Sequence, residues 1–228
     1  MSIVNRLTDE QILANKTEFI ELIKSIDRPN ANIDKLIEKL EISDFFEAPA
    51  STNYHGAYKG GLCDHSLNVY YNMMHLLNYK AQSLGINVED ESQYQVCTNS
   101  VKIVALLHDI SKINTYTVSS KNVKVYDDTL GDKSDAVGNF YWNSELSYST
   151  IESENRFVYG SHEMTSEYMV RQFIPLNVQE SVAILHHMGS MSWDSAKDNI
   201  GLVFNKYPMA LLLYMADMLS SYVDERTF

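Results

Sequence analysis

The sequence has few of the residues that interrupt regular structure, with nine glycines and four prolines among 228 residues. It has no low-complexity tract and no internal repeat. Only two cysteines occur, Cys63 and Cys97, far apart and without CxxC spacing. This scarcity disfavours a disulfide framework and a thiolate zinc site. Because 45% of the residues are hydrophobic, we expect a globular, helix-rich chain with a sizeable core.

Positive charge is also scarce, since 18 Lys and Arg face 30 Asp and Glu for a formal net charge of −12. This balance disfavours binding to long nucleic acid, but it permits a small phosphorylated substrate held by a metal and a lysine. The longest apolar run lies within 208–219 and is too short to span a membrane. The first 26 residues lack the apolar segment of a signal peptide. We therefore expect a cytoplasmic protein with no membrane partner, and a homo-oligomer is left open.

Hydrophobic periodicity indicates a mainly helical chain. The predicted helices are 8–26, 33–40, 64–81, 94–112, 163–173, 178–188 and 208–223. Between them, residues 114–159 alternate polar with β-branched and aromatic side chains, which is typical of short strands or hairpins. We expect an all-α fold with a small β-hairpin-like insertion around 114–159 that covers a site. A single domain 1–228 would comprise N-terminal helices (1–45), this insertion, and a helical core from 54–112 and 160–224.

Asp217 stands out because every neighbour in the run 208–219 is apolar. A carboxylate in such surroundings needs a partner, because its desolvation costs several kcal/mol. A metal ion is a common partner for a buried acid. The chain offers further candidate ligands upstream, namely His65, His108, Asp109, His162 and His187.

His108 and Asp109 are consecutive, so on a helix they point about 100° apart and can still converge on one ion. Lys112 follows on the same face, where its charge would neutralise a phosphate. We therefore expect Asp109 and Lys112 to be catalytic, although a solvated lysine at a helix C-terminus is the plainer alternative for Lys112. Imidazole and carboxylate together suit Mn, Fe, Ni, Co or Zn.

Single histidines in amphipathic helices more often pack or face solvent than bind metal. His75 lies ten residues after His65, about 15 Å along the same predicted helix, so it cannot share that ion. We assign His75 to packing or to the surface. His55 lies in a loop, and a place at the rim of the site stays open for it.

These motifs resemble those of the HD-domain superfamily of metal-dependent phosphohydrolases. The resemblance rests on Gly60-Gly-Leu-Cys-Asp-His65, Ala105-Leu-Leu-His108-Asp109-Ile-Ser-Lys112 and Tyr214-Met-Ala-Asp217. It covers the chain from about residue 55 onward. The sequence is similar to the HD domain of a bacterial 3′-to-5′ exoribonuclease, and more so to stand-alone HD hydrolases of bacteria and phages. The resemblance implies an all-α HD-domain bundle with metal at its centre.

The same resemblance implies one or two divalent transition metals per chain, and we expect two. Asp109 would then bridge them, with His65, His108 and Asp217 on the first ion. His162 and His187 would hold the second. The family pattern places this ligand two residues before a glycine, which favours His187 and leaves His186 as its alternate.

The segment Tyr58-Lys59-Gly60-Gly61 directly precedes the helix that carries His65. We expect these four residues, with Lys112, to bind substrate. Glycines let a backbone approach a ligand closely, and Tyr58 could stack on a base. A plain turn at the start of the helix is the alternative.

The implied reaction is hydrolysis of a phosphomonoester or phosphodiester of a small nucleotide-type substrate by a metal-activated water. Three alternatives stay open. One is a 3′-to-5′ exonuclease on single-stranded nucleic acid, and another is a di-iron oxygenase of the HD fold. The last is a regulator without catalysis, which the intact set of ligands disfavours.

Overall fold

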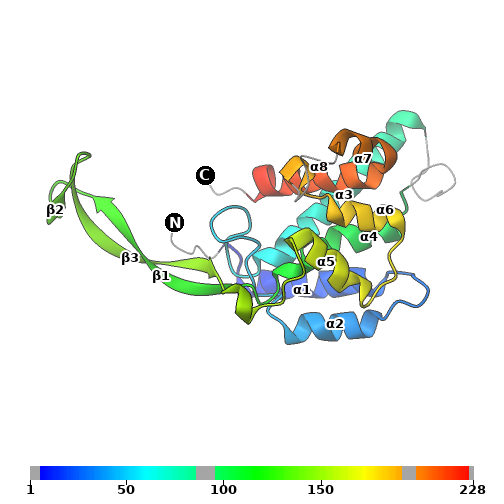
Figure 1. Cartoon of the computed structure of the whole chain (residues 1–228), viewed down its shortest axis with the longest axis horizontal. Helices are drawn as coiled ribbons and strands as arrows, with labels where there is room; N and C mark the ends of the chain where they lie inside the picture. Colours follow the sequence, from blue (N-terminus) through cyan, green and yellow to red (C-terminus); the bar gives the residue numbers. More distant parts are fainter. Residues whose placement is uncertain (1–5, 86–95, 192–198, 226–228) are drawn as a thin grey trace.

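A body of helices carries one long two-stranded arm that projects from it (Figure 1). The computed structural model describes residues 6–85, 96–191 and 199–225. The helices are α1 (Asp9–Lys24), α2 (Ile33–Ile42), α3 (Gly61–Leu84), α4 (Thr98–Leu107), α5 (His162–Arg171), α6 (Val178–Leu185), α7 (Ile200–Lys206) and α8 (Pro208–Leu219). The strands are β1 (Tyr116–Tyr126), β2 (Lys133–Ser134) and β3 (Asn139–Thr150).

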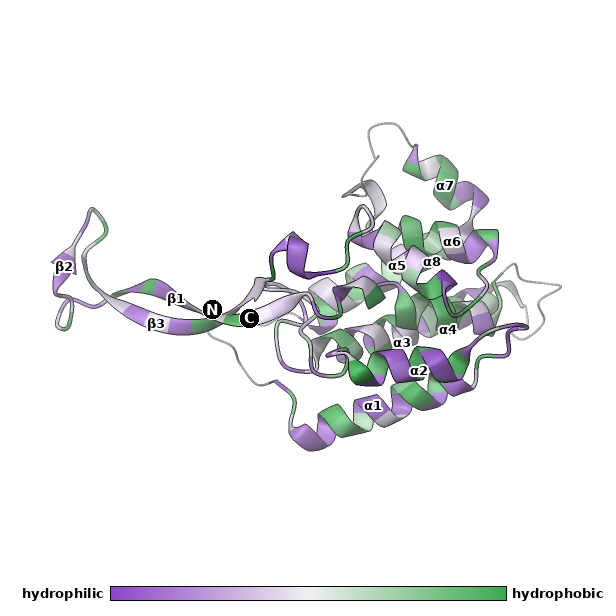
Figure 2. Cartoon of the chain, turned by 60° about the horizontal axis from the view of Figure 1, so that its bottom comes forward, coloured by the Kyte–Doolittle hydropathy of each residue, from purple (hydrophilic) through white to green (hydrophobic). Residues whose placement is uncertain are grey.

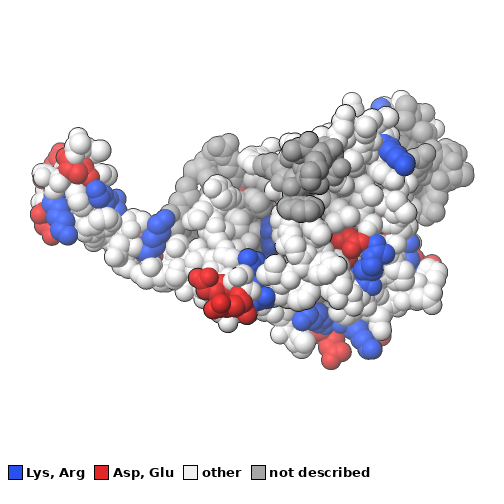
Figure 3. Space-filling model, viewed as in Figure 1, with Lys and Arg blue, Asp and Glu red and all other residues white. Residues whose placement is uncertain are grey.

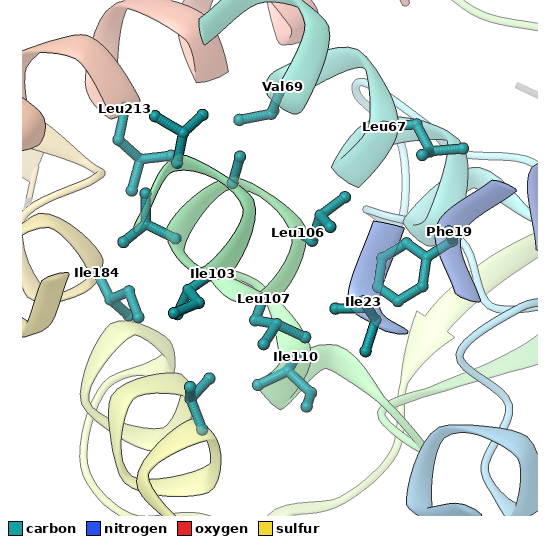
Figure 4. Packing of buried hydrophobic residues seen from close by; sticks show 14 of the residues in the cluster. Phe19, Ile23, Leu67, Val69, Ile103, Leu106, Leu107, Ile110, Ile184 and Leu213 are labelled. Atoms are coloured by element: carbon teal, nitrogen blue, oxygen red, sulfur yellow. The ribbon is translucent and has the colours of Figure 1, made fainter. Parts of the chain in front are cut away.

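Helix α4 is the centre of the hydrophobic core, and seven of its ten residues are buried. Figure 4 shows its Ile103, Leu106 and Leu107 enclosed by side chains from the surrounding helices. These come from α1 (Phe19, Ile23), α3 (Leu67, Val69), α6 (Ile184) and α8 (Leu213). Each fully buried Leu or Ile contributes roughly 1.5–3 kcal/mol. This packing fixes the end of α4 in the middle of the body, and His108 and Asp109 follow there.

Two helices begin with capping boxes, close to the residues where the sequence predicted them to start. Thr8 and Gln11 bond reciprocally before α1, and Asn177 and Glu180 do so before α6. Ser161 caps α5 by accepting from the Met164 amide. These side chains satisfy amides that have no partner within the helix.

Several predicted helix ends were wrong. The helix predicted over 94–112 is α4 followed by a 3₁₀ turn at Ile110–Lys112, and its first two predicted residues lie outside the described residues. The helix predicted over 178–188 ends at Leu185. The last helix changes to a π-helical turn at Ser220–Asp224, and α7 was not predicted. Weak periodicity over only seven residues explains why α7 was missed.

The all-α expectation was wrong, because the chain is mixed α and β with 54% helix and 12% strand. Strands β1 and β3 pair antiparallel along their whole length, from Tyr116 opposite Thr150 to Tyr126 opposite Phe140. Strand β2 adds to β3 at the far end, giving the order β1-β3-β2. The strands lie in the segment where short strands or hairpins were predicted, but they are far longer than a small insertion.

One face of the arm is aromatic. Directly paired residues of antiparallel strands share a face, so Tyr126, Phe140, Lys124 and Trp142 lie together. The Lys124 ammonium lies 4.2 Å from the centre of the Phe140 ring and 5.8 Å from that of Trp142. Figure 2 shows polar and apolar residues interspersed along the arm, and Figure 3 shows acidic and basic side chains together at its tip.

Among the described residues, no helix combines the length and the apolar character that crossing a membrane requires.

Candidate metal centre

Six side chains distant in sequence meet where α3, α5, α6 and α8 pack around the end of α4. They are His65 on α3, His108 and Asp109 after α4, His162 on α5, His187 after α6, and Asp217 on α8. Five are buried, and the sixth, His162, keeps 37% of its side chain exposed. These are the six residues expected from the sequence to be ligands. In the described part of the chain their donor atoms form three overlapping groups, each within 4.8 Å.

One half of the cluster, termed the inner position, consists of His65, His108, Asp217 and the Oδ2 atom of Asp109. The Nε2 atoms of the two histidines are 3.3 Å apart. Asp109 Oδ2 lies 3.7 Å from His65 Nε2 and 3.5 Å from His108 Nε2. Asp217 Oδ1 lies 3.4 Å from His65 Nε2. A donor atom of Asp217 also lies within 4.8 Å of donor atoms of His108 and His187, so the inner position adjoins the outer one.

The other half, termed the outer position, consists of His162, His187 and the Oδ1 atom of Asp109. The two Nε2 atoms are 3.2 Å apart. Asp109 Oδ1 lies 3.8 Å from the first and 3.7 Å from the second. Asp109 thus presents one oxygen to each half, which is the geometry of a bridging carboxylate.

The protonation of the rings decides what this cluster can bind. His108 Nδ1 donates to the Ala105 carbonyl at 2.9 Å, and His187 Nδ1 donates to the Ile184 carbonyl at 2.8 Å. A carbonyl only accepts, so in the neutral ring Nε2 carries a lone pair that points into the cluster. Asp109 Oδ1 is buried with no hydrogen-bond partner. Buried acceptors that converge in this way need a cation, so the residues fit divalent metal ions.

Charges within the cluster stabilise one another against the cost of burial. Burial alone would lower the pKa of His65, yet the carboxylates of Glu225 and Asp217 outweigh it and raise that pKa to about 10. Burial would raise the pKa of Asp217, but His65 holds it well below its usual range. The pKa of His187 falls to about 4 through burial and the nearby His108. Ionised acids and a neutral His187 are the states in which these groups bind metals.

Lys112 lies beside the cluster, on the 3₁₀ turn that follows α4. Its Nζ is 2.6 Å from Asp109 Oδ2, and 15% of its side chain is exposed. Burial would lower the pKa of Lys112, but the carboxylate of Asp109 raises it, so the ammonium stays charged. The structure therefore brings both residues expected to be catalytic into contact.

The segment before α3 lies differently from the expectation. Tyr58 is 2% exposed and its hydroxyl donates to Asp64 at 2.6 Å, so its ring faces cannot stack on a base. Lys59 lies 3.4 Å from Asp9 and 4.0 Å from Glu47 in surface ion pairs. Neither side chain belongs to the cluster.

The two glycines of this segment serve close packing within the chain. Gly60 has φ +79°, in the left-handed region, and forms the N-cap of α3. A Cβ on Gly61 would lie 2.0 Å from the Gly56 carbonyl oxygen. These contacts match the alternative of a turn that begins the helix, and a role in substrate binding stays a prediction.

Three further histidines are placed clearly. His75 is exposed on α3, and His186 belongs to none of the ligand groups, so His187 is the member of the pair that enters the cluster. His55 lies at the rim, with its ring centre 4.9 Å from that of His65. Burial is the main reason that its pKa falls to about 4.

Glu225 was missed in the sequence although it is 1% exposed and contacts the cluster directly. It accepts hydrogen bonds from His65 Nδ1 at 3.0 Å and Asn68 Nδ2 at 3.1 Å. The π-helical turn Ser220–Asp224 brings it there, closed by a bond from the Glu225 amide to the Ser220 carbonyl. No periodic pattern signals such a turn, so only the structure could reveal this contact.

A groove of about 820 Å³ lies where the arm meets the body. It is lined by residues that include Lys59, Tyr116, Glu145, Leu146 and Tyr148. Tyr116 also interacts electrostatically with Lys112 and Asp109. Tyr116 therefore links the groove to the cluster electrostatically, while its hydroxyl donates to the Ala50 carbonyl at 3.4 Å.

The TraI_2 family model, described as a putative helicase, matches residues 4–181, which is more than half of the chain. The chain belongs to this family. No curated protein and no solved structure matches it. The predicted membership of the HD-domain superfamily, with its likeness to an exoribonuclease domain, was therefore wrong. The same arrangement of reactive residues can arise in unrelated families. Short His and Asp motifs therefore indicate a kind of chemistry more reliably than they indicate membership of a family.

The TraI_2 match includes the N-terminal helices, which the predicted resemblance did not cover. It contains His65, His108, Asp109 and His162, and it ends before His187 and Asp217. The description is that of an enzyme, so the chain belongs to an enzyme family.

Proposed function

We propose that this chain hydrolyses a phosphomonoester or phosphodiester of a nucleotide-type substrate with the help of two divalent transition-metal ions. One observation carries the proposal. The two oxygens of Asp109 face two separate histidine pairs, in each of which the Nε2 atoms lie 3.2–3.3 Å apart. Such a bridged arrangement is the common design of enzymes that cleave phosphate esters.

The inner and outer positions would hold the ions. Imidazole and carboxylate donors without thiolate suit Mn, Fe, Co, Ni or Zn. Bound there, such ions lower the pKa of a coordinated water and polarise phosphoryl oxygens. The chain fixes these donors rigidly, because His108 and His187 are each held by a backbone carbonyl at their Nδ1 atoms.

Lys112 supplies a fixed positive charge next to Asp109. Its ammonium can donate a hydrogen bond to a phosphoryl oxygen and neutralise charge that develops during cleavage. The surroundings are largely buried, so this electrostatic interaction is screened less than it would be in water. Tyr116 lines the groove at the base of the arm and interacts electrostatically with Lys112, so we expect substrate to approach from this groove.

A second candidate is a nuclease acting on single strands from the 3′ end. The arm favours it, because Tyr126 and Trp142 are 46% and 47% exposed and flank Lys124 on one face. Exposed aromatic side chains near a cation are a common surface for stacking bases.

Metal analysis and a substrate screen test the proposal together. The purified chain should contain about two transition-metal ions and release product from a chromogenic phosphomonoester, a phosphodiester or a labelled single-stranded oligonucleotide. The variant Asp109→Asn should lose the activity, whereas Asp128→Asn, the same change at the exposed arm tip, should keep it. Full hydrolysis by Asp109→Asn on every substrate would contradict the proposal. Oxygen consumption without product release would favour an oxygenase instead.

A further inference from the structure

Helix α8 and the π turn that follows it place one carboxylate on each side of the His65 ring. Asp217 Oδ1 lies 3.4 Å from His65 Nε2, while Glu225 accepts from His65 Nδ1 at 3.0 Å. Asn68, one turn along α3, also donates to Glu225. Glu225 reaches this place only because the helix widens to a π turn between the two acids. His65 is therefore held in one orientation by two ionisable partners.

None of the other three rings of the cluster has such a partner. His108 and His187 donate to neutral backbone carbonyls. His162 Nδ1 is 3.3 Å from Glu163 Oε2, but that oxygen makes no hydrogen bond. A carboxylate hydrogen-bonded behind an imidazole fixes the ring and raises its basicity as a ligand. By this criterion His65 is the strongest nitrogen donor of the cluster.

The two positions also differ in the number of donors and in exposure. The inner position has four donors, two of them carboxylates, and each side chain is at most 5% exposed. The outer position has three donors and a single carboxylate oxygen, and His162 is 37% exposed. Charge, donor count and burial all favour the inner position for a divalent cation.

We propose that Glu225 is a positioning residue that makes the two metal positions unequal, so that the inner position binds tightly and the outer position exchanges. This inference rests on the proposed function, because it concerns the same metal ions. Glu225 acts through His65, and the outer position keeps room for substrate or water because it has fewer donors. The consequence is a permanent ion and a replaceable one.

Titration of the metal-free full chain with Mn²⁺ by calorimetry tests this ranking. The wild type should show two classes of site. Glu225→Gln, which keeps the shape and removes the charge, should weaken the tight class by about 10- to 100-fold and leave the weak class unchanged. His162→Ala should remove the weak class alone. Asp128→Asn, which removes a charge from the exposed arm tip, should leave both classes unchanged.

Visible absorption of bound Co²⁺ gives a readout that a merely structural role would not change. The spectrum of the first equivalent should differ between wild type and Glu225→Gln, and it should be unchanged in His162→Ala. If Glu225→Gln does not fold, Glu225→Asp keeps the charge on a shorter side chain and should show a smaller loss. The comparison of wild type with His162→Ala shows which position binds metal more tightly, and it needs no change at Glu225.

Two equal sites in the wild type, or a Glu225→Gln variant that weakens both classes alike or neither, would overturn the inference. Equal sites in a protein that hydrolyses its substrate leave the proposed function standing. Unequal sites that respond as expected, in a protein with no hydrolysis on any substrate, support the inference and contradict the proposed function.

Discussion

The helical body and the arm are stabilised in different ways. Seven residues of α4 are buried among four other helices, whereas β1 and β3 together bury only Phe140 and Ser147. The body depends on apolar burial, and the arm depends on its hydrogen-bond ladder and on contacts between paired side chains. All six clustered ligands belong to the body. The candidate metal centre therefore lies in the part of the molecule that tolerates change least.

A matched pair of leucine substitutions should show this difference most strongly. Leu106→Ala in α4 should lower the free energy of unfolding by about 2–5 kcal/mol, because it leaves a cavity in the core. Leu146→Ala on β3, where the side chain is 57% exposed, should change it by less than about 0.5 kcal/mol. Urea denaturation measures both. Equal losses would mean that the arm is as tightly packed as the body.

Two lysines extend the comparison to catalysis. Lys112→Met should reduce the rate of phosphate-ester hydrolysis by about 10²- to 10³-fold, because it removes a positive charge beside Asp109. Lys121→Met on the exposed part of the arm should leave the rate on a small chromogenic substrate unchanged. Initial rates at saturating substrate make the comparison. An unchanged rate for Lys112→Met would show that this lysine takes no part in the reaction.

Removal of metal should weaken the body and spare the arm. Ions present at about 100 times their dissociation constant would stabilise the folded chain by about 2.7 kcal/mol. A chelator should therefore lower the melting temperature, and added Mn²⁺ should restore it. Hydrogen exchange should increase around α8 and little in β1 and β3. An equal increase of hydrogen exchange in the body and the arm would show that metal binding stabilises the arm as well.

Trp142→Ala should have the smallest effect of the series on stability, within about 0.5 kcal/mol, because the ring is 47% exposed. If the arm binds single strands, the same change should weaken binding of a labelled oligonucleotide by about 1–3 kcal/mol. Tyr222→Ala, which removes an exposed ring from the body, is the control. If both changes affect oligonucleotide binding equally, the arm has no specific role in binding the substrate.

The sequence was informative wherever the signal was local or periodic. The starts predicted at residues 8 and 178 agree closely with α1 and α6, because each start depends on a capping bond to a residue three positions away. Asp217 was readable as a candidate ligand because an isolated acid in an apolar run needs a partner, whereas the pairing of His162 with His187 came from the resemblance to another family. The central place of α4 followed from its nearly continuous apolar second half.

The sequence was uninformative wherever tertiary contacts decide. Burial of Tyr58 and the approach of Gly61 to Gly56 depend on segments that pack only after folding. The contact between Glu225 and His65 spans 160 residues and needs a change of helix type. The length of the arm could not be judged from alternation alone, since alternation does not reveal where pairing stops.

The course of α8 has a practical consequence for work with this protein. Asp217 and Glu225 sit on either side of the π turn, and Arg6 and Asn72 bond to the intervening Asp224. Any displacement of these final turns would move Asp217, a candidate metal ligand, together with the carboxylate that supports His65. A substitution that shifts residues 220–225 is therefore expected to change both carboxylate contacts to His65 together.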